Sequence, residues 1–270
     1  QTITFADPAF KAKLLSANNT NFVASTEEPT YQSFYDNWTG FNSVPIDTNG
    51  DGEIQVSEAQ AIKCLNLRYA NYSSLVGIEH FTNLKSLRIE DHQLTSLDLT
   101  ANTALINVRC ERGRLTSLNI MGLVNLISLH CDTNNILNLD VSTCVALEDL
   151  VINNNEMTQL NLTGTFALKS VNLDQNRFTT VDLSNRPYLK KVLCNNGWVE
   201  NFSVVGCPLL EMLQLHQNRI TSLNLTTNPL LSYLRAEFNR MTYLDLTQCP
   251  LLTYVDVNNN QMRDLDVSHQ

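Results

Sequence analysis

Residues 126–146 read LISLHCDTNNILNLDVSTCVA, and this stretch is one copy of a pattern that fills most of the chain. Counted outward in steps of 21, the same kind of apolar residue returns nine times without a slip in register. The first apolar column consists of Leu84, Leu105, Leu126, Leu147, Leu168, Leu189, Leu210, Leu231 and Leu252. The columns three and five residues later are also apolar, and self-similarity of this kind is the signature of a repeat architecture.

Each copy contains two short stretches of alternating polarity, as in residues 86–90 and 96–100, and a period of two predicts β-strands. A single copy cannot bury its own apolar side, whereas stacked copies bury one another's. We therefore expect a mostly β solenoid of parallel strands over residues 65–270, with two short strands in each coil. It should contain about nine regular coils after one irregular first coil.

An asparagine recurs in the turn after the first strand, at Asn134, Asn155, Asn176, Asn218, Asn239 and Asn260. Its side chain is suited to bond backbone groups of the turn and so to link neighbouring coils. The position is occupied by His92, Gly113 and Gly197 in three other copies.

The consensus LxxLxCxxNxLTSLDLSxNx, over about residues 65–268, resembles the leucine-rich-repeat family, and most closely its bacterial type with 21-residue repeats. The resemblance implies a leucine-rich-repeat solenoid that presents a concave sheet for recognition. It also favours a protein over a glycan as the partner.

Composition excludes several classes of protein. The chain has 270 residues, a net charge of −9 and 43% hydrophobic residues, so it has enough apolar material for a folded core. The acidic balance argues against a nucleic-acid partner, which requires a basic face. We find no apolar run long enough for a membrane span. The seven cysteines include no CxxC pair and fall mostly into two repeat columns, which predicts apolar packing.

Residues 1–64 lack the repeat and should form an N-terminal cap, with a helix over residues 7–17. Residues 47–58, DTNGDGEIQVSE, match the EF-hand calcium loop. Side-chain oxygens would come from Asp47, Asn49 and Asp51, a backbone carbonyl from Glu53, and a bidentate carboxylate from Glu58. The alternative is an Asp/Gly-rich turn that only caps a helix over residues 57–64. We expect a structural Ca²⁺ that holds the cap on the solenoid.

Similar calcium loops before leucine-rich repeats are a feature of exported bacterial proteins that this sequence resembles. The chain starts at Gln1 without a recognisable leader, so we expect a secreted or cell-surface protein whose signal peptide has been removed. A polar capping sequence is lacking after the last repeat, and we expect further domains beyond Gln270 in the full-length protein.

The outward columns of the first strand vary between copies, as a recognition surface requires. Towards the C-terminus they combine aromatic, arginine and acidic residues, which are common anchors of binding sites. The candidate ligand-binding residues are Trp198, His216, Arg219, Tyr233, Arg235, Glu237, Phe238, Arg240, Tyr254 and Asp256. Near the N-terminus, Arg88, Arg109, Arg112 and Arg114 interleave with Glu90, Glu111 and Asp132, a pattern typical of a self-satisfied salt-bridge lattice.

We therefore interpret the chain as a non-catalytic recognition or adhesion module that binds a protein through the concave face and is stabilised by calcium. One alternative is binding of a glycan through the C-terminal aromatic residues, because such rings stack on sugars. Another is a passive spacer or stalk. No catalytic motif is present in the sequence, and His130 and Cys131 point to opposite faces of a strand, so they form no dyad.

Overall fold

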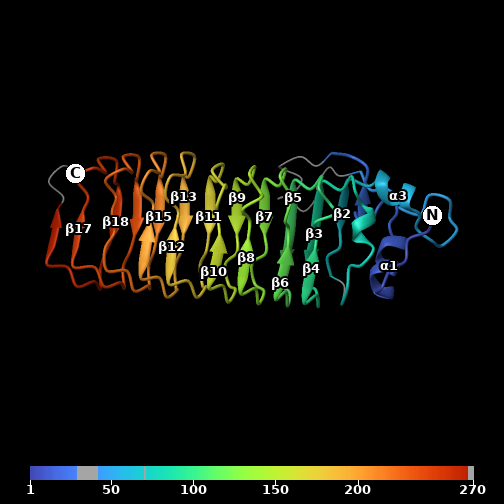
Figure 1. Cartoon of the computed structure of the whole chain (residues 1–270), viewed down its shortest axis with the longest axis horizontal. Helices are drawn as coiled ribbons and strands as arrows, with labels where there is room; N and C mark the ends of the chain where they lie inside the picture. Colours follow the sequence, from blue (N-terminus) through green and yellow to red (C-terminus); the bar gives the residue numbers. More distant parts are fainter. Residues whose placement is uncertain (29–41, 70, 267–270) are drawn as a thin grey trace. The chain divides into compact units, whose positions relative to one another are not determined.

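The computed structural model describes residues 1–28, 42–69 and 71–266, and the chain divides into two compact units, Gln1–Ile136 and Leu137–Gln270. Both units consist of stacked coils of the repeat, and the described chain is mostly β with few helices (Figure 1). The predicted fold class, a solenoid of parallel strands with a small helical N-terminal cap, is confirmed.

The first unit contains the cap and the first coils. Its helices are α1 (Pro8–Leu15), α3 (Val56–Ala61) and the 3-10 helix η1 (Ile78–His80). Its strands are β1 (Ala24–Ser25), β2 (Cys64–Asn66), β3 (Ser86–Glu90), β4 (Ser96–Asp98), β5 (Asn107–Glu111), β6 (Ser117–Asn119) and β7 (Ser128–His130). Strands β2, β3, β5 and β7 form a parallel sheet, to which β1 adds antiparallel at β2.

The second unit repeats this arrangement. Its strands are β8 (Asn138–Asp140), β9 (Asp149–Val151), β10 (Gln159–Asn161), β11 (Ser170–Asn172), β12 (Thr180–Asp182), β13 (Lys191–Leu193), β14 (Asn201–Ser203), β15 (Met212–Gln214), β16 (Tyr233–Arg235), β17 (Tyr243–Asp245), β18 (Tyr254–Asp256) and β19 (Asp264–Asp266). Strands β9, β11, β13, β15, β16 and β18 form the main sheet, and every neighbour is parallel. The second strands of the coils pair two by two, as β8–β10, β12–β14 and β17–β19.

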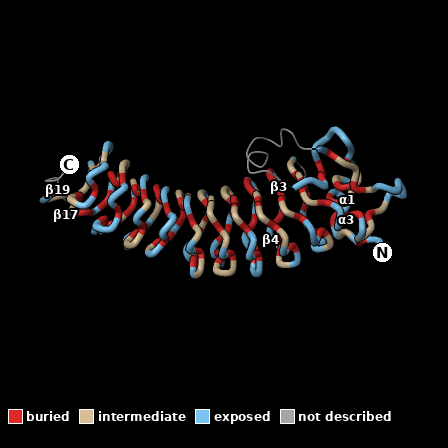
Figure 2. Tube along the Cα trace, turned by 90° about the horizontal axis from the view of Figure 1, so that it is seen from above, coloured by how far each residue is buried: buried red, intermediate tan, exposed pale blue. Residues whose placement is uncertain are grey.

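Residues that lie opposite each other on neighbouring strands of these sheets are 21 positions apart, which is the period of the sequence. Leu150 lies opposite Val171, and Val171 lies opposite Val192, each one repeat further along the chain. All three side chains are fully buried, and burial of one such side chain contributes roughly 1.5–3 kcal/mol. Buried positions recur from coil to coil as far as Cys249, while exposed positions lie in the turns and at the ends of second strands such as β4 and β8 (Figure 2).

The recurrent asparagine links coils as predicted. The Asn176 amide donates to the carbonyl of Ile152 in the preceding coil (3.0 Å) and to that of Leu173 in its own turn (3.1 Å). Its Oδ1 accepts from the Met157 N–H at 3.0 Å. The same set of bonds recurs at Asn218 and Asn239. The side chain thus satisfies backbone groups that the tight turn would otherwise leave unpaired.

One departure from this asparagine column is explained by packing. His92 is buried at the asparagine position, and the next coil has Gly113 there. A Cβ at Gly113 would lie 2.0 Å from Cε1 of His92. The larger imidazole therefore requires the absence of a side chain one coil later.

The cap is attached through Asp7. Its carboxylate is the N-cap of α1, accepting from the Ala9 N–H at 2.7 Å. It also accepts from the N–H (2.7 Å) and the hydroxyl (2.8 Å) of Ser73, which lies in the loop after β2. The second helix of the cap begins at Val56 but ends at Ala61, because Cys64 starts strand β2. An expected helix over residues 57–64 is therefore wrong at its C-terminal end.

All seven cysteines are free and buried, as expected of apolar packing. Cys110, in β5, and Cys131, directly after the end of β7, are buried in neighbouring coils. In the turn column, the Cys207 thiol donates to the Leu183 carbonyl at 3.1 Å. Burial raises the pKa of Cys144 to about 11, so this thiol is inert near neutral pH.

Candidate functional site

Two tyrosines form a stacked pair on the main sheet of the second unit. Tyr233 begins β16, Tyr254 begins β18, and the parallel register places them side by side. Their ring centroids are 4.5 Å apart and the planes differ by 7°. Tyr254 is 42% exposed and Tyr233 is half-buried, so the pair presents an aromatic surface to solvent.

Charged groups lie next to this pair along the same strands. Arg235 is opposite Asp256 in the sheet and forms an ion pair with Glu237. Glu237 is 5% exposed, and its hydrogen bond raises the pKa of Arg235. We define Tyr233, Arg235, Glu237, Tyr254 and Asp256 as the tyrosine cluster. It combines a flat apolar surface with a charged rim, which is the composition of many binding hot spots.

Trp198 belongs to a separate group. Its ring is 47% exposed and lies between the guanidinium groups of Arg177 and Arg219, with their carbons 5.8 Å and 5.6 Å from the ring centroid. Arg177 and Arg219 also lie near Glu156 (3.3 Å) and Glu200 (3.8 Å). Cation–π contacts of this kind hold an exposed indole in place and contribute about 0.5–1 kcal/mol each.

The ten candidate ligand residues therefore do not form one site. Tyr233 and Tyr254 stand at the start of their strands, whereas Trp198 lies in the turn beyond the end of β13. Strand direction thus places the two stacked tyrosines and Trp198 at opposite margins of the sheet. Arg177 was missed by sequence reasoning, although it stands one repeat before Trp198 and the period would have found it.

The remaining candidates lie in or near the turns after the main strands. Phe238 and Arg240 are exposed, and His216 is half-buried with its backbone N–H donating to Asn195 (3.0 Å). Phe238 adopts a φ of +56°, a left-handed backbone conformation that asparagine, as at Asn154 and Asn259, adopts more readily. The same conformation recurs at this turn position in Arg112 and Gln217, so the turn does not depend on one type of side chain.

In the first unit the charged residues of the sheet are satisfied by one another. Glu90 pairs with Arg68 (3.1 Å), Arg88 and Arg112 (2.7 Å). Glu111 pairs with Arg109 at 2.6 Å and is 3.6 Å from His130. The predicted salt-bridge lattice is therefore present at Arg88, Arg109, Arg112, Glu90 and Glu111, whereas Arg114 and Asp132 take part in none of these ion pairs.

The pKa of Glu111 reflects this lattice. Burial opposes ionisation, but hydrogen bonds from His130 and Arg109 outweigh it and lower the pKa to about 2. The carboxylate therefore stays charged over the physiological pH range, and its role is structural.

The predicted calcium loop is folded as a tight turn. Asp47 accepts from the N–H groups of Gly50 (2.7 Å) and Gly52 (3.0 Å), both of which have positive φ. Glu58, in the first turn of α3, accepts from Thr48 (2.7 Å) and Gln55 (2.9 Å). Burial opposes ionisation, but these backbone bonds keep the pKa of Glu58 below its usual value.

The donor set of this loop consists of oxygens alone, which suits a hard cation such as Ca²⁺. Within the described residues, however, no three His, Cys, Asp or Glu side chains are gathered in a metal-binding arrangement. In the same residues, no helix is long and apolar enough to cross a bilayer.

No protein-family model and no curated protein sequence match this chain. Among solved structures, the chain is similar to the functional domain of InlJ from Listeria monocytogenes, which is described as including a cysteine ladder. The TM-score is 0.77 and the identity 25%, over all of this chain and 55% of that chain, so the chain spans about half the length of that structure.

Two more distant likenesses show the same fold. The leucine-rich-repeat protein LIC12759 of Leptospira interrogans matches with a TM-score of 0.67 and 20% identity, over 77% of this chain and 58% of that one. The leucine-rich-repeat domain of APL1B matches with a TM-score of 0.64 and 17% identity, over 77% and 69%. The chain therefore has the fold of a leucine-rich-repeat solenoid.

Proposed function

We propose that the chain is a non-catalytic recognition module that binds a protein partner through the main sheet of its second unit. The observation that carries the proposal is the stacked, solvent-facing pair Tyr233–Tyr254 beside Arg235 and Asp256. A core fold needs no such pair at this exposed place, whereas a protein interface uses tyrosine and arginine as anchors. Leucine-rich-repeat neighbours support a role in protein interaction.

The test is binding to an array of purified extracellular proteins, with affinities measured for the proteins that bind. Tyr254→Ala should weaken such a complex about tenfold or more, because a hot-spot side chain contributes roughly 2 kcal/mol. Tyr188→Ala is the matched control, since Tyr188 is also exposed but lies in a turn outside the main sheet. Equal losses in the two variants, or no specific protein ligand at all, would contradict the proposal.

A glycan array run with the same variants addresses the second function. Exposed aromatic rings beside acid and amide groups would suit sugar stacking. In this chain, however, Trp198 lies between two guanidinium groups, and each tyrosine of the pair is covered on one face by the other ring. These contacts leave less ring surface for a sugar. Glycan binding that depends on Trp198 would favour the glycan function. If the chain binds nothing on either array, a spacer or stalk is favoured.

We further propose that the loop at residues 47–58 binds a structural Ca²⁺ and that the protein acts outside the cell. Asp47, Asn49, Asp51, the Glu53 carbonyl and Glu58 supply the oxygens, and Gly50 and Gly52 already adopt the positive φ of the turn. Glu58 lies where helix α3 begins, so a bound ion would fasten this helix to the loop. Extracellular calcium is abundant enough to fill a weak site of this type.

Calorimetric titration of the metal-free protein with CaCl₂ tests the site. We expect one ion with a Kd of roughly 0.1–1 mM, the range of extracellular modules. Glu58→Gln and Asp51→Asn should each weaken binding, whereas Glu148→Gln, an exposed residue of the second unit, should not. If the calorimetric titration releases or absorbs no heat, and a parallel titration with terbium gives no luminescence, calcium binding at this loop is excluded.

A further inference from the structure

The second row of strands is interrupted within the second unit. Strand β10 pairs with β8 and β12 pairs with β14, but β10 and β12 belong to separate sheets. Asn161 donates its amide to Asp140 in the preceding coil at 3.1 Å, and its Oδ1 accepts from the backbone N–H of Thr163.

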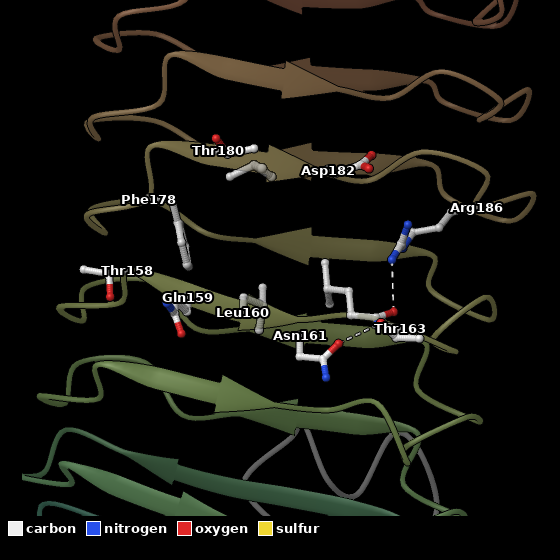
Figure 3. Close-up of a pocket in the computed structure, with 11 residues that line it drawn as sticks. Thr158, Gln159, Leu160, Asn161, Thr163, Phe178, Thr180, Asp182 and Arg186 are labelled. Carbon is white, nitrogen blue, oxygen red and sulfur yellow. Dashed lines mark hydrogen bonds between the residues drawn. The ribbon is translucent and has the colours of Figure 1, made fainter.

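A cavity of about 460 Å³ lies between β10 and β12. Its apolar lining comes from Leu160, Leu162, Phe178 and Val181, and polar groups such as Thr180 lie around them (Figure 3). The volume is in the range of small-molecule sites, which are typically apolar with a few directed polar groups.

Arg186 supplies the directed polar group. It lies in the turn after β12, and its side chain reaches towards the segment of Thr163 (Figure 3). Its guanidinium donates to the carbonyls of Leu162 (3.1 Å) and Ser184 (2.7 Å). The residue is only 6% exposed, and its Nε–H has no hydrogen-bond partner. No ion pair joins it to a carboxylate within the part of the chain that is described.

The position does not require an arginine for folding. Residues one and two coils later, Cys207 and Asn228, occupy the same turn column. Asn228 donates to the carbonyl of Val204 in the preceding coil at 3.1 Å, as Arg186 does to Leu162. A small neutral side chain therefore meets the structural need, while a buried, unpaired guanidinium is costly. The cation needs a different explanation.

We propose that this cavity binds a small monocarboxylate with a compact apolar body, its carboxylate on the Arg186 guanidinium and its apolar part against Phe178 and Leu160. A carboxylate accepts from a guanidinium in a charge-assisted pair, which would neutralise the buried cation. Asp182, exposed at the rim, already interacts electrostatically with Arg186, so it repels a ligand with two negative charges more strongly than a monocarboxylate. The site is separate from the tyrosine cluster and does not depend on the proposed protein partner.

Binding is tested by saturation-transfer NMR and calorimetry with benzoate and hexanoate, each against its neutral counterpart, benzamide and hexanol. The wild-type chain should bind the two carboxylates at least about tenfold more tightly than the neutral compounds, because a hydrogen bond to a charged group is being measured. Arg186→Asn should abolish this preference. It should keep the fold, since asparagine already serves at Asn228.

A second variant separates the cavity from general anion binding. Leu160 is half-buried at the cavity, so Leu160→Trp should fill it and weaken both carboxylates about tenfold or more while retaining Arg186. Circular dichroism establishes that each variant is folded. Equal affinity of the wild type for benzoate and benzamide, no binding of either carboxylate at millimolar concentration, or undiminished binding in folded Arg186→Asn would overturn the proposal.

Discussion

Asp7→Asn should open the N-terminal cap without unfolding the coils. The carboxylate is 7% exposed and joins two segments distant in sequence, the start of α1 and the loop at Ser73. Asparagine keeps the shape of the side chain. It replaces one acceptor oxygen by an NH₂ group, which cannot accept from the Ser73 or Ala9 N–H.

The magnitude follows from the pKa of Asp7. The Ser73 N–H is the largest cause of a decrease from 3.8 to about 2, which outweighs the opposing effect of burial. At about 1.36 kcal/mol for each pKa unit, this decrease corresponds to roughly 2 kcal/mol, which changes an equilibrium constant by a factor of some tens. Because the pKa is lower in the folded state, this stabilisation is present above pH 3.8 and is lost as the pH falls towards 2.

Hydrogen exchange followed by mass spectrometry measures this local opening directly. Peptides that cover residues 8–17 and 71–78 should exchange up to some tens of times faster in Asp7→Asn at pH 7, while peptides of the second unit stay unchanged. Asp264→Asn, which removes an exposed carboxylate from β19, controls for the change in net charge. Unaltered exchange at α1 and Ser73 would refute the argument that this carboxylate fastens the cap.

The remaining predictions concern the coils and the loop. Asn218→Ala should lower the free energy of unfolding by about 2–3 kcal/mol in urea denaturation, because it leaves the buried Val199 N–H without its acceptor. Asn258→Ala, which removes an exposed side chain, should change the free energy of unfolding by no more than about 0.5 kcal/mol. Equal effects of the two substitutions would contradict the coil-linking role of the recurrent asparagine. Removal of calcium with EGTA should lower the melting temperature and leave the far-ultraviolet circular dichroism of the coils unchanged. An unaltered melting temperature would argue against a structural ion.

The repeat period predicted most of the fold, for a physical reason. A strict period determines which residues are neighbours in adjacent coils, so the pairing of Leu150 with Val171 follows from counting. The coil-linking role of Asn176 was equally accessible, because a buried amide in a turn must bond the backbone around it. The period also contained Arg177 beside Trp198, which a search for aromatic clusters along the chain did not find.

The division of the candidate site has a different origin. Trp198 and Tyr233 are both aromatic residues of the later coils. Tyr233 is the first residue of a main-sheet strand, whereas Trp198 lies in the turn beyond the end of such a strand, so the length of the strand separates them. Residues at the same repeat position in neighbouring coils are therefore predicted to be in contact, as Tyr233 and Tyr254 are. Residues at different positions of the repeat are not.

The cavity beside Arg186 shows where column reasoning stops. The columns of the second strand look uniform in polarity, and a uniform column predicts that every coil pairs with the next. In the structure these strands pair two by two, so β10 pairs with β8 and β12 pairs with β14, but β10 and β12 are not partners. Arg186 follows β12 in the chain, and only the folded arrangement places it at the cavity between β10 and β12.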